Sequence, residues 1–201
     1  MFLKCPPPLI LASTSRYRKE LLSRLGLTFS CSPPGVDEAT RPGEHPKALV
    51  ERLAKAKASA VALQQPDAWV IGSDQIALLD QDGAHSVLGK PGTEARCREQ
   101  LRSCSGRTVD FLTAVALMHK ESNGLIEFID TTRVRFRILD QATIERYVAK
   151  EQPLDCAGGF KSEGLGIALC ESIDSTDPSA LIGLPLIRLS AALRTAGFEV
   201  P

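Results

Sequence analysis

Residues 8–26, PLILASTSRYRKELLSRLG, hold a short apolar run followed at once by an amphipathic segment. The apolar run predicts a strand near residues 8–13, and the small polar residues after it are of the types that cap helix N-termini. A helix is then expected near residues 15–25, and a second strand near residues 27–32. The chain therefore opens with strand, helix and strand in turn, an alternation typical of α/β folds.

The predicted helix begins with positive charge, because Arg16, Arg18 and Lys19 all fall in its first turn or so. A helix N-terminus is itself positive, so each cation there is expected to cost about 0.3–1 kcal/mol. Free N–H groups together with arginine side chains form a binding site for phosphate. We therefore interpret this end as an anion site, with solvated surface arginines as the alternative.

Composition describes an ordinary globular protein of 201 residues, 43% hydrophobic and 24% charged, with a formal net charge of zero. We expect a single domain over residues 1–201, since no internal repeat or linker interrupts the chain. No broad basic face suggests a nucleic-acid binder, and no apolar run approaches the ~20 residues that cross a bilayer. The first thirteen residues, MFLKCPPPLILAS, make a poor leader because prolines break a short apolar stretch.

The six cysteines occur at positions 5, 31, 97, 104, 156 and 170, and no two have C-x-x-C spacing. With only three histidines present, a zinc site is not expected. Several cysteines have apolar neighbours, so we interpret them as buried reduced thiols. That interpretation predicts a cytoplasmic protein.

Further along, helical and strand-like segments alternate, but hairpins interrupt the alternation. Hairpin turns are predicted at residues 80–83, DQDG, and at residues 121–124, ESNG, so the sheet should be mixed rather than wholly parallel. Helices are predicted at residues 46–64, within residues 89–106, near residues 141–151 and within residues 184–197. Strands are predicted at residues 68–80, 108–120 and 125–139.

One strand contains an unexpected acid, because Asp74 and Gln75 interrupt the apolar run VIGSDQIALL. A buried carboxylate costs several kcal/mol unless it has a partner. Asp74 is therefore a candidate metal ligand or general base, and a strand-end turn cap is the alternative. Strict alternation would place Asp74 on one face, with Ser73 and Gln75 on the other.

Two glycine-rich segments carry further charges. Lys90 lies in GKPG, which is not a P-loop because the glycine spacing is one residue too long and proline replaces the Ser or Thr. Lys161 and Glu163 lie in AGGFKSEGLG, where glycines permit close approach of the backbone to a ligand. Solvated surface charges are the alternative in both. With Glu38, these residues form a set suited to a nucleoside triphosphate held with a divalent cation.

Seven ordered motifs resemble those of the Maf family of nucleotide pyrophosphatases over nearly the whole chain. They are LILASTSRYRKELLSRLG, VDE, RLAKAKA, VIGSDQ, GKP, CAGGFKSEG and LIGLPLIRL. The resemblance implies an α/β fold like that of inosine-triphosphate pyrophosphatases, with a cleft beside a mixed sheet. It also implies hydrolysis between the α- and β-phosphates, which releases pyrophosphate and removes unwanted nucleotides.

Within the family, the aromatic residue before the second arginine, GSDQ and FKSEG are similar to the branch acting on 7-methyl-GTP. The resemblance implies that Asp74 accepts a proton from water and that Glu38 and Asp74 hold Mg²⁺ or Mn²⁺. The positions implied to set base preference are Tyr17, Gln75 and Glu163. The positions implied to hold phosphates are Ser13, Arg18, Lys57, Lys90 and Lys161.

The chain departs from the family pattern at two positions, because Arg16 replaces a usual proline and Tyr17 stands where tryptophan is common. A cationic base should favour the aromatic ring of Tyr17 and the carboxylate of Glu163. Two alternatives remain: a dTTP/UTP pyrophosphatase of the sister branch, and a non-catalytic nucleotide-binding regulator of cell division. A homodimer is a family expectation, and no nucleic-acid or membrane partner is expected.

Overall fold

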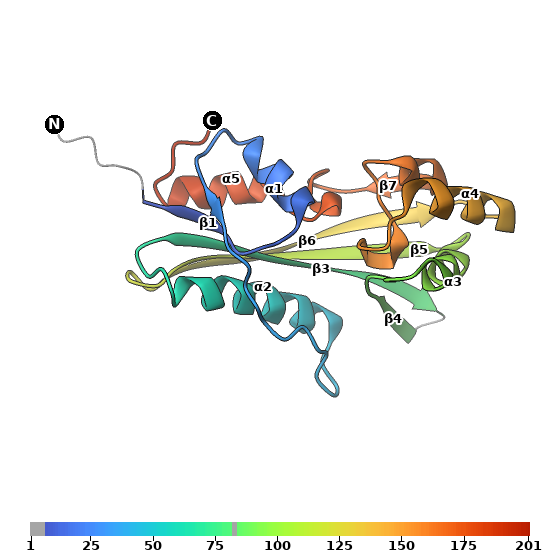
Figure 1. The fold of residues 1–201 in the computed structure, drawn as a ribbon, viewed down its shortest axis with the longest axis horizontal. Coiled ribbons are helices and arrows are strands. Elements are labelled where there is room, and N and C mark those ends of the chain that lie inside the picture. The colour runs from blue at the N-terminus through green and yellow to red at the C-terminus, as the bar shows by residue number, and fades with distance from the viewer. Residues whose placement is uncertain (1–6, 82–83) are drawn as a thin grey trace. The chain divides into compact units, whose positions relative to one another are not determined.

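The computed structural model describes residues 7–81 and 84–201, which form two compact units (Figure 1). The first unit contains the described residues up to Asp74, with Thr113–Asp130 and Gly183–Pro201. The second contains Gln75–Leu112 and Thr131–Ile182. Each unit is assembled from separate stretches of chain. The single domain expected over residues 1–201 stays a prediction.

The strands hydrogen-bond in the order β2-β1-β3-β5-β6-β7, and β4 pairs with β3. The pairings are both parallel and antiparallel: β1 is parallel to β2 and β3, whereas β4 is antiparallel to β3 and β7 is antiparallel to β6. The mixed α/β sheet is therefore confirmed. The strands are β1 (Leu9–Leu11), β2 (Ser30–Cys31), β3 (Trp69–Gln81), β4 (Ala84–Leu88), β5 (Thr108–His119), β6 (Gly124–Phe136) and β7 (Cys170–Asp174).

The predicted helices are confirmed with small differences at their ends. They are α1 (Arg16–Ser23), α2 (Pro46–Ala62), α3 (Glu94–Cys104), α4 (Gln141–Glu151) and α5 (Leu186–Thr195). Three short 3-10 turns follow α4: η1 (Ala157–Gly159), η2 (Leu165–Leu169) and η3 (Ala180–Ile182). The strand predicted at residues 27–32 is only the two residues of β2, because its neighbours make no sheet pairing.

Both predicted hairpins are present. Residues 120–123 turn between β5 and β6, and Asn123 adopts the left-handed conformation that such turns require. Gln81 pairs with Ala84 at the end of the β3–β4 ladder, whereas turn residues 82–83 lie outside the described residues.

In the first unit, α2 covers one face of the sheet, and α1 and α5 lie on the other (Figure 1). The core beside α2 is built mostly from small residues, so the helix lies close to the strands. Its members are Ile10, Ala12, Ala58, Val61, Ala62, Ala68, Val70 and Ala116. The second unit has a bulkier core in which the ring of Phe160 lies 5.6 Å from Phe111 and 5.1 Å from Phe136.

The helix α2 approaches β3 very closely at Gly72. A Cβ atom at Gly72 would lie 2.2 Å from the carbonyl oxygen of Ala54 and 2.5 Å from the amide nitrogen of Ala58. Both contacts are with backbone atoms of α2, which cannot move aside unless the whole helix shifts. The missing side chain therefore sets the distance between α2 and the strand that carries Asp74.

The cysteines only partly match the prediction of buried thiols. Cys97 and Cys104 are buried, Cys156 and Cys170 are half-buried, Cys31 is exposed, and Cys5 lies outside the described residues. Burial raises the pKa of the Cys97 thiol to about 11 and that of Cys104 to about 12, so both are inert at neutral pH. In the described part of the chain, no helix is long and apolar enough to cross a membrane.

Gly72→Ala should destabilise the protein by about 2 kcal/mol, because the added methyl group must push α2 away from β3. Urea unfolding measures the effect. Gly89→Ala is the matched control, since a Cβ there meets nothing within 4 Å. Equal stability of the two variants would contradict the proposed close approach.

Candidate active site

The centre of the candidate site is the ammonium group of Lys57, which lies between two carboxylates in the first unit. Its Nζ atom lies 2.6 Å from Oδ1 of Asp74 and 2.6 Å from Oε1 of Glu38. The side chains of Lys57 and Asp74 are 7% and 10% exposed, whereas that of Glu38 is 55% exposed. Lys57 thus supplies the partner that a carboxylate inside an apolar strand requires.

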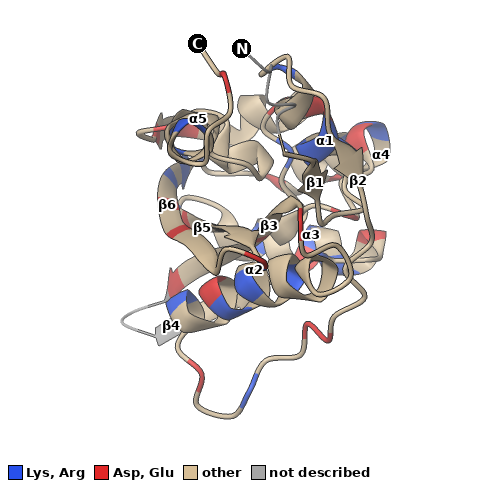
Figure 2. Ribbon diagram, turned by 90° about the vertical axis from the view of Figure 1, so that its left-hand side faces the viewer, with Lys and Arg blue, Asp and Glu red and all other residues tan. Residues whose placement is uncertain are grey.

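The sequence places this lysine within the apolar face of α2. Leu53, Ala54 and Val61 lie three or four residues from Lys57 and are buried with it, so all four share one face of the helix. Because α2 packs tightly over Gly72, Lys57 reaches Asp74 two residues further along β3. Residues of both charge signs are spread along α2 (Figure 2), and Lys47, Glu51 and Lys55 among them are exposed.

Strand alternation holds at Asp74, as predicted. Asp74 faces α2, whereas Ser73 turns the other way and donates a hydrogen bond of 3.0 Å to the carbonyl oxygen of Gly183. β3 runs unbroken from Trp69 to Gln81, so both residues belong to one continuous strand.

Arg18 is fixed at the start of α1. Ser15 caps this helix, its hydroxyl accepting a hydrogen bond from the backbone N–H of Arg18, and Ser13 is buried just before the cap. The guanidinium Nε of Arg18 donates to the carbonyl oxygen of Gly183 at 3.0 Å. Burial lowers the pKa of Arg18, and the carboxylates of Asp74 and Glu38 raise it in part, so this cation shares the electrostatic environment of the Lys57 cluster.

Arg16 and Tyr17, which precede Arg18 in α1, contact each other. Arg16 donates a 2.7 Å hydrogen bond to the Tyr17 hydroxyl, and its guanidinium carbon lies 4.7 Å from the centre of the Tyr17 ring. Arg16 therefore covers the aromatic surface that was expected to receive a cationic base.

The other predicted residues belong to the second unit. The side-chain amide of Gln75 donates to the carbonyl oxygens of Ala180 and Leu181 at 3.0 and 3.1 Å. Lys161 forms an ion pair with Glu151, while Glu163 and Lys90 are exposed. No ion-pair partner for Lys90 is found in the described part of the chain.

The structure thus brings together Arg18, Glu38, Lys57 and Asp74 of the predicted set. Sequence reasoning missed Gly183, whose carbonyl oxygen joins Arg18 to Ser73, and it missed Glu151 and Tyr147, which bind the segment of Lys161. A signal for Glu151 and Tyr147 is their i, i+4 spacing on a predicted helix just before the glycine-rich segment.

The donors for a metal ion are few. Among the described residues, no group of three or more His, Cys, Asp or Glu side chains is placed to hold one. Glu38 and Asp74 nevertheless converge, since an oxygen of each touches the same Lys57 atom. Two carboxylates suit Mg²⁺, which commonly takes one or two protein carboxylates and completes its shell with substrate phosphates and water.

Lys57→Met should destabilise the protein by about 3 kcal/mol, because it leaves Asp74 as an unpaired buried charge. Adding Asp74→Asn should recover part of this loss. Lys55→Met is the matched control: it removes the exposed pair with Glu127, whose side chains are 50% and 42% exposed, and should cost under ~1 kcal/mol. Chemical denaturation measures all three, and equal losses for the two lysine variants would contradict the buried pair.

The Maf-like protein family matches residues 8–196 of the chain. A 7-methyl-GTP pyrophosphatase of Xanthomonas oryzae pv. oryzae (strain MAFF 311018) is 56% identical over 97% of this chain and 100% of its own length. Proteins of the same name from Alkalilimnicola ehrlichii and Nitrosococcus oceani are 54% and 48% identical, covering 96% and 97% of this chain and 96% of each relative.

The solved structure of the Staphylococcus aureus Ham1 protein matches 64% of this chain and 71% of its own, at 14% identity and a TM-score of 0.46, which is a weak likeness. The sequence matches, by contrast, span nearly the full length both of this chain and of the relatives. The chain belongs to the Maf-like protein family.

Proposed function

We propose that the protein is a nucleoside triphosphate pyrophosphatase that hydrolyses 7-methyl-GTP to 7-methyl-GMP and pyrophosphate. The observation that carries this proposal is the carboxylate of Asp74, buried in β3 and held at one oxygen by Lys57. Such a carboxylate is oriented for proton transfer, and relatives at 48–56% identity bear the name of this activity.

In the proposed reaction, water attacks the α-phosphorus and the bond from that phosphorus to the bridging oxygen breaks. Asp74 accepts the proton of the attacking water, and pyrophosphate leaves with the bridging oxygen. Lys57, held in place by two carboxylates, and Arg18, anchored on the Gly183 carbonyl, lie ready to bind phosphate oxygens. A divalent cation bound by Glu38 and Asp74 would supply further neutralisation of phosphate charge.

We assign selection of the base to Tyr17, Gln75 and Glu163. In addition to Lys57 and Arg18, the proposed phosphate contacts are Ser13, Lys90 and Lys161. A methylated guanine is cationic, so the exposed carboxylate of Glu163 and the ring of Tyr17 favour it over neutral bases. The proposed role is removal of modified nucleotides in the cytoplasm, where the free thiols of the described cysteines would stay reduced. A homodimer remains part of the proposal.

Asp74→Asn should abolish turnover while leaving nucleotide binding largely intact, because the amide cannot accept the proton. Pyrophosphate release from 7-methyl-GTP, GTP, UTP and dTTP measures turnover, with magnesium and after chelation, and calorimetry measures binding. Turnover at the wild-type rate by this variant would refute the assignment of Asp74. Preference for UTP and dTTP would favour the sister branch, and binding without release by the wild type would favour a regulator.

Arg16→Ala should raise the preference for 7-methyl-GTP over GTP about threefold, because it uncovers the ring of Tyr17. An exposed cation–π contact is worth roughly 0.5–1 kcal/mol, which a cationic base must replace. The ratio of kcat/KM for the two nucleotides is the measurement. Lys19→Ala, one turn further into α1, is the control, and an unchanged ratio in Arg16→Ala would contradict competition by Arg16.

A further inference from the structure

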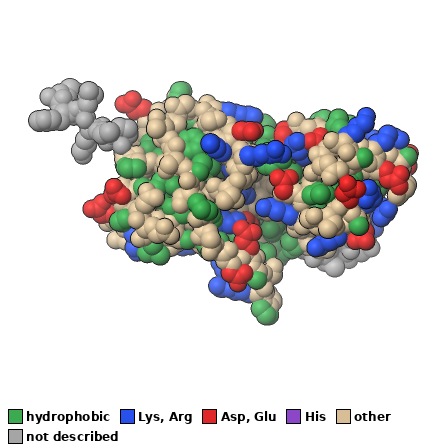
Figure 3. All heavy atoms as spheres, viewed as in Figure 1, with side chains coloured by type: hydrophobic (Ala, Val, Ile, Leu, Met, Phe, Trp, Pro, Cys, Tyr) green, Lys and Arg blue, Asp and Glu red, His purple; other side chains and the backbone are tan. Residues whose placement is uncertain are grey.

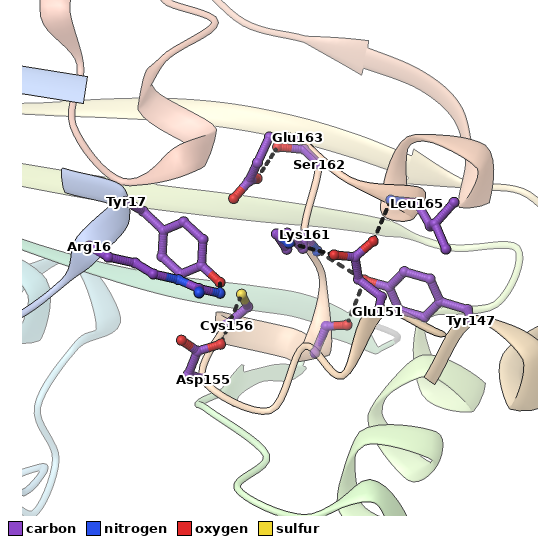
Figure 4. A network of polar contacts seen from close by, with 11 residues as sticks. Arg16, Tyr17, Tyr147, Glu151, Asp155, Cys156, Lys161, Ser162, Glu163 and Leu165 are labelled. Carbon is purple, nitrogen blue, oxygen red and sulfur yellow. Dashed lines mark hydrogen bonds and ion pairs between the residues drawn. The ribbon is translucent and has the colours of Figure 1, made fainter. Parts of the chain in front are cut away.

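Two side chains from one face of α4 hold the segment that carries Lys161 and Glu163 (Figure 4). They are Tyr147 and Glu151, which are four residues apart and so lie on the same side of the helix. We propose that Glu151, together with Tyr147, is a positioning residue that fixes this segment for nucleotide recognition. The inference rests on the proposed function and deepens it.

Both carboxylate oxygens of Glu151 are engaged. Oε1 accepts a 2.5 Å hydrogen bond from the Lys161 ammonium, and Oε2 accepts a 2.7 Å bond from the backbone N–H of Leu165. Burial raises the pKa of Glu151, but the bonds from Lys161 and Leu165 outweigh it and leave the pKa below its ordinary value. The carboxylate is therefore charged at neutral pH and ties together both ends of residues 161–165.

Tyr147 binds the same segment through its hydroxyl. The oxygen accepts a 3.0 Å hydrogen bond from the backbone N–H of Lys161 and donates one of 3.2 Å to the carbonyl of Gly159. Burial raises the pKa of Tyr147 far above its usual range, so the hydroxyl keeps the proton that it donates. Phe160, between these two bonds, is packed into the aromatic core.

The glycines of the segment make room for these contacts. The carbonyl of Lys161 accepts hydrogen bonds from the N–H groups of Gly164 and Gly166. A Cβ at Gly164 would lie 2.5 Å from Oε2 of Glu151, and one at Gly166 would lie 2.3 Å from the Lys161 carbonyl oxygen. The backbone N–H, the carbonyl and the ammonium of Lys161 are thus all fixed.

Ser162 and Glu163 follow the fixed residue Lys161 in the segment, and Glu163 is exposed. A free lysine side chain samples many rotamers, and ordering it on binding costs affinity. Glu151 orders Lys161 in advance and fixes the backbone from which Glu163 extends. Loss of the Glu151 charge should therefore weaken phosphate binding and also reduce the selectivity for the base.

Glu151→Gln tests the proposal, because the amide keeps the shape but has only one acceptor for two donors. We expect kcat/KM for 7-methyl-GTP to fall roughly tenfold, mainly through KM, and the preference over GTP to fall severalfold. The preference ratio does not depend on the fraction of folded enzyme, so a merely structural role would leave it unchanged. Glu145→Gln, an exposed glutamate on the same helix, is the matched control.

Gly164→Ala provides an independent route to the same defect. Its φ of −119° lies outside the left-handed region, and the added methyl group would meet the flexible end of Glu151 rather than backbone. The same loss of preference is expected, and the double variant with Glu151→Gln should be no worse than the worse single variant. Fully additive losses would overturn a shared mechanism.

The proposal fails if Glu151→Gln keeps the wild-type KM and preference, or if it slows both nucleotides equally, while the wild type hydrolyses 7-methyl-GTP. Absence of pyrophosphate release by the wild type would instead refute the proposed function. Calorimetry with 7-methyl-GTP then decides the positioning role: weaker binding by Glu151→Gln than by Glu145→Gln supports it. Equal binding, or no binding by any form, overturns it.

Discussion

The structure of the first unit depends on one requirement, that the carboxylate of Asp74 inside β3 must have a cationic partner. Lys57 meets it from α2 at 2.6 Å, and Glu38 adds a second carboxylate to the same ammonium. The ammonium reaches the strand only because Gly72 has no side chain and the adjoining core consists of small residues. Packing and electrostatics are therefore coupled, since widening the helix–sheet gap would also separate the charges.

The second unit follows the same physical logic around a different ion pair. Glu151 approaches the loop of Lys161 because Gly164 has no Cβ, just as α2 approaches β3 at Gly72. In each unit a glycine permits a lysine–carboxylate contact whose atoms are largely shielded from water. Shielding from water strengthens the attraction between paired charges and raises the free-energy cost of leaving either charge unpaired. Each ion pair therefore restrains the positions of the elements that carry it.

Much of the fold follows from the sequence, because hydrophobic period, caps and turn residues are local signals. Ser15 caps α1, Pro46 begins α2 and Asn123 turns the β5–β6 hairpin, each where the residue type predicts. The length of β2 was overestimated, because the length of a strand depends on its partner strand and the local sequence pattern carries no information about that partner. Candidate site residues were found where polar groups interrupt apolar periodicity, as at Asp74. Glu151, Tyr147 and Gly183 were missed because their roles arise from tertiary contacts.

The balance of charge around Asp74 bears on what such a site can bind. Arg18 and Lys57 are matched in number by Glu38 and Asp74, so these four groups together offer a polyphosphate little net attraction. A site evolved only to hold a nucleotide would have no use for two carboxylates facing these two cations. Added positive charge from a divalent cation would remove this contradiction, and a carboxylate beside bound phosphates is what proton abstraction from water needs. The paired acids therefore favour hydrolysis over passive binding.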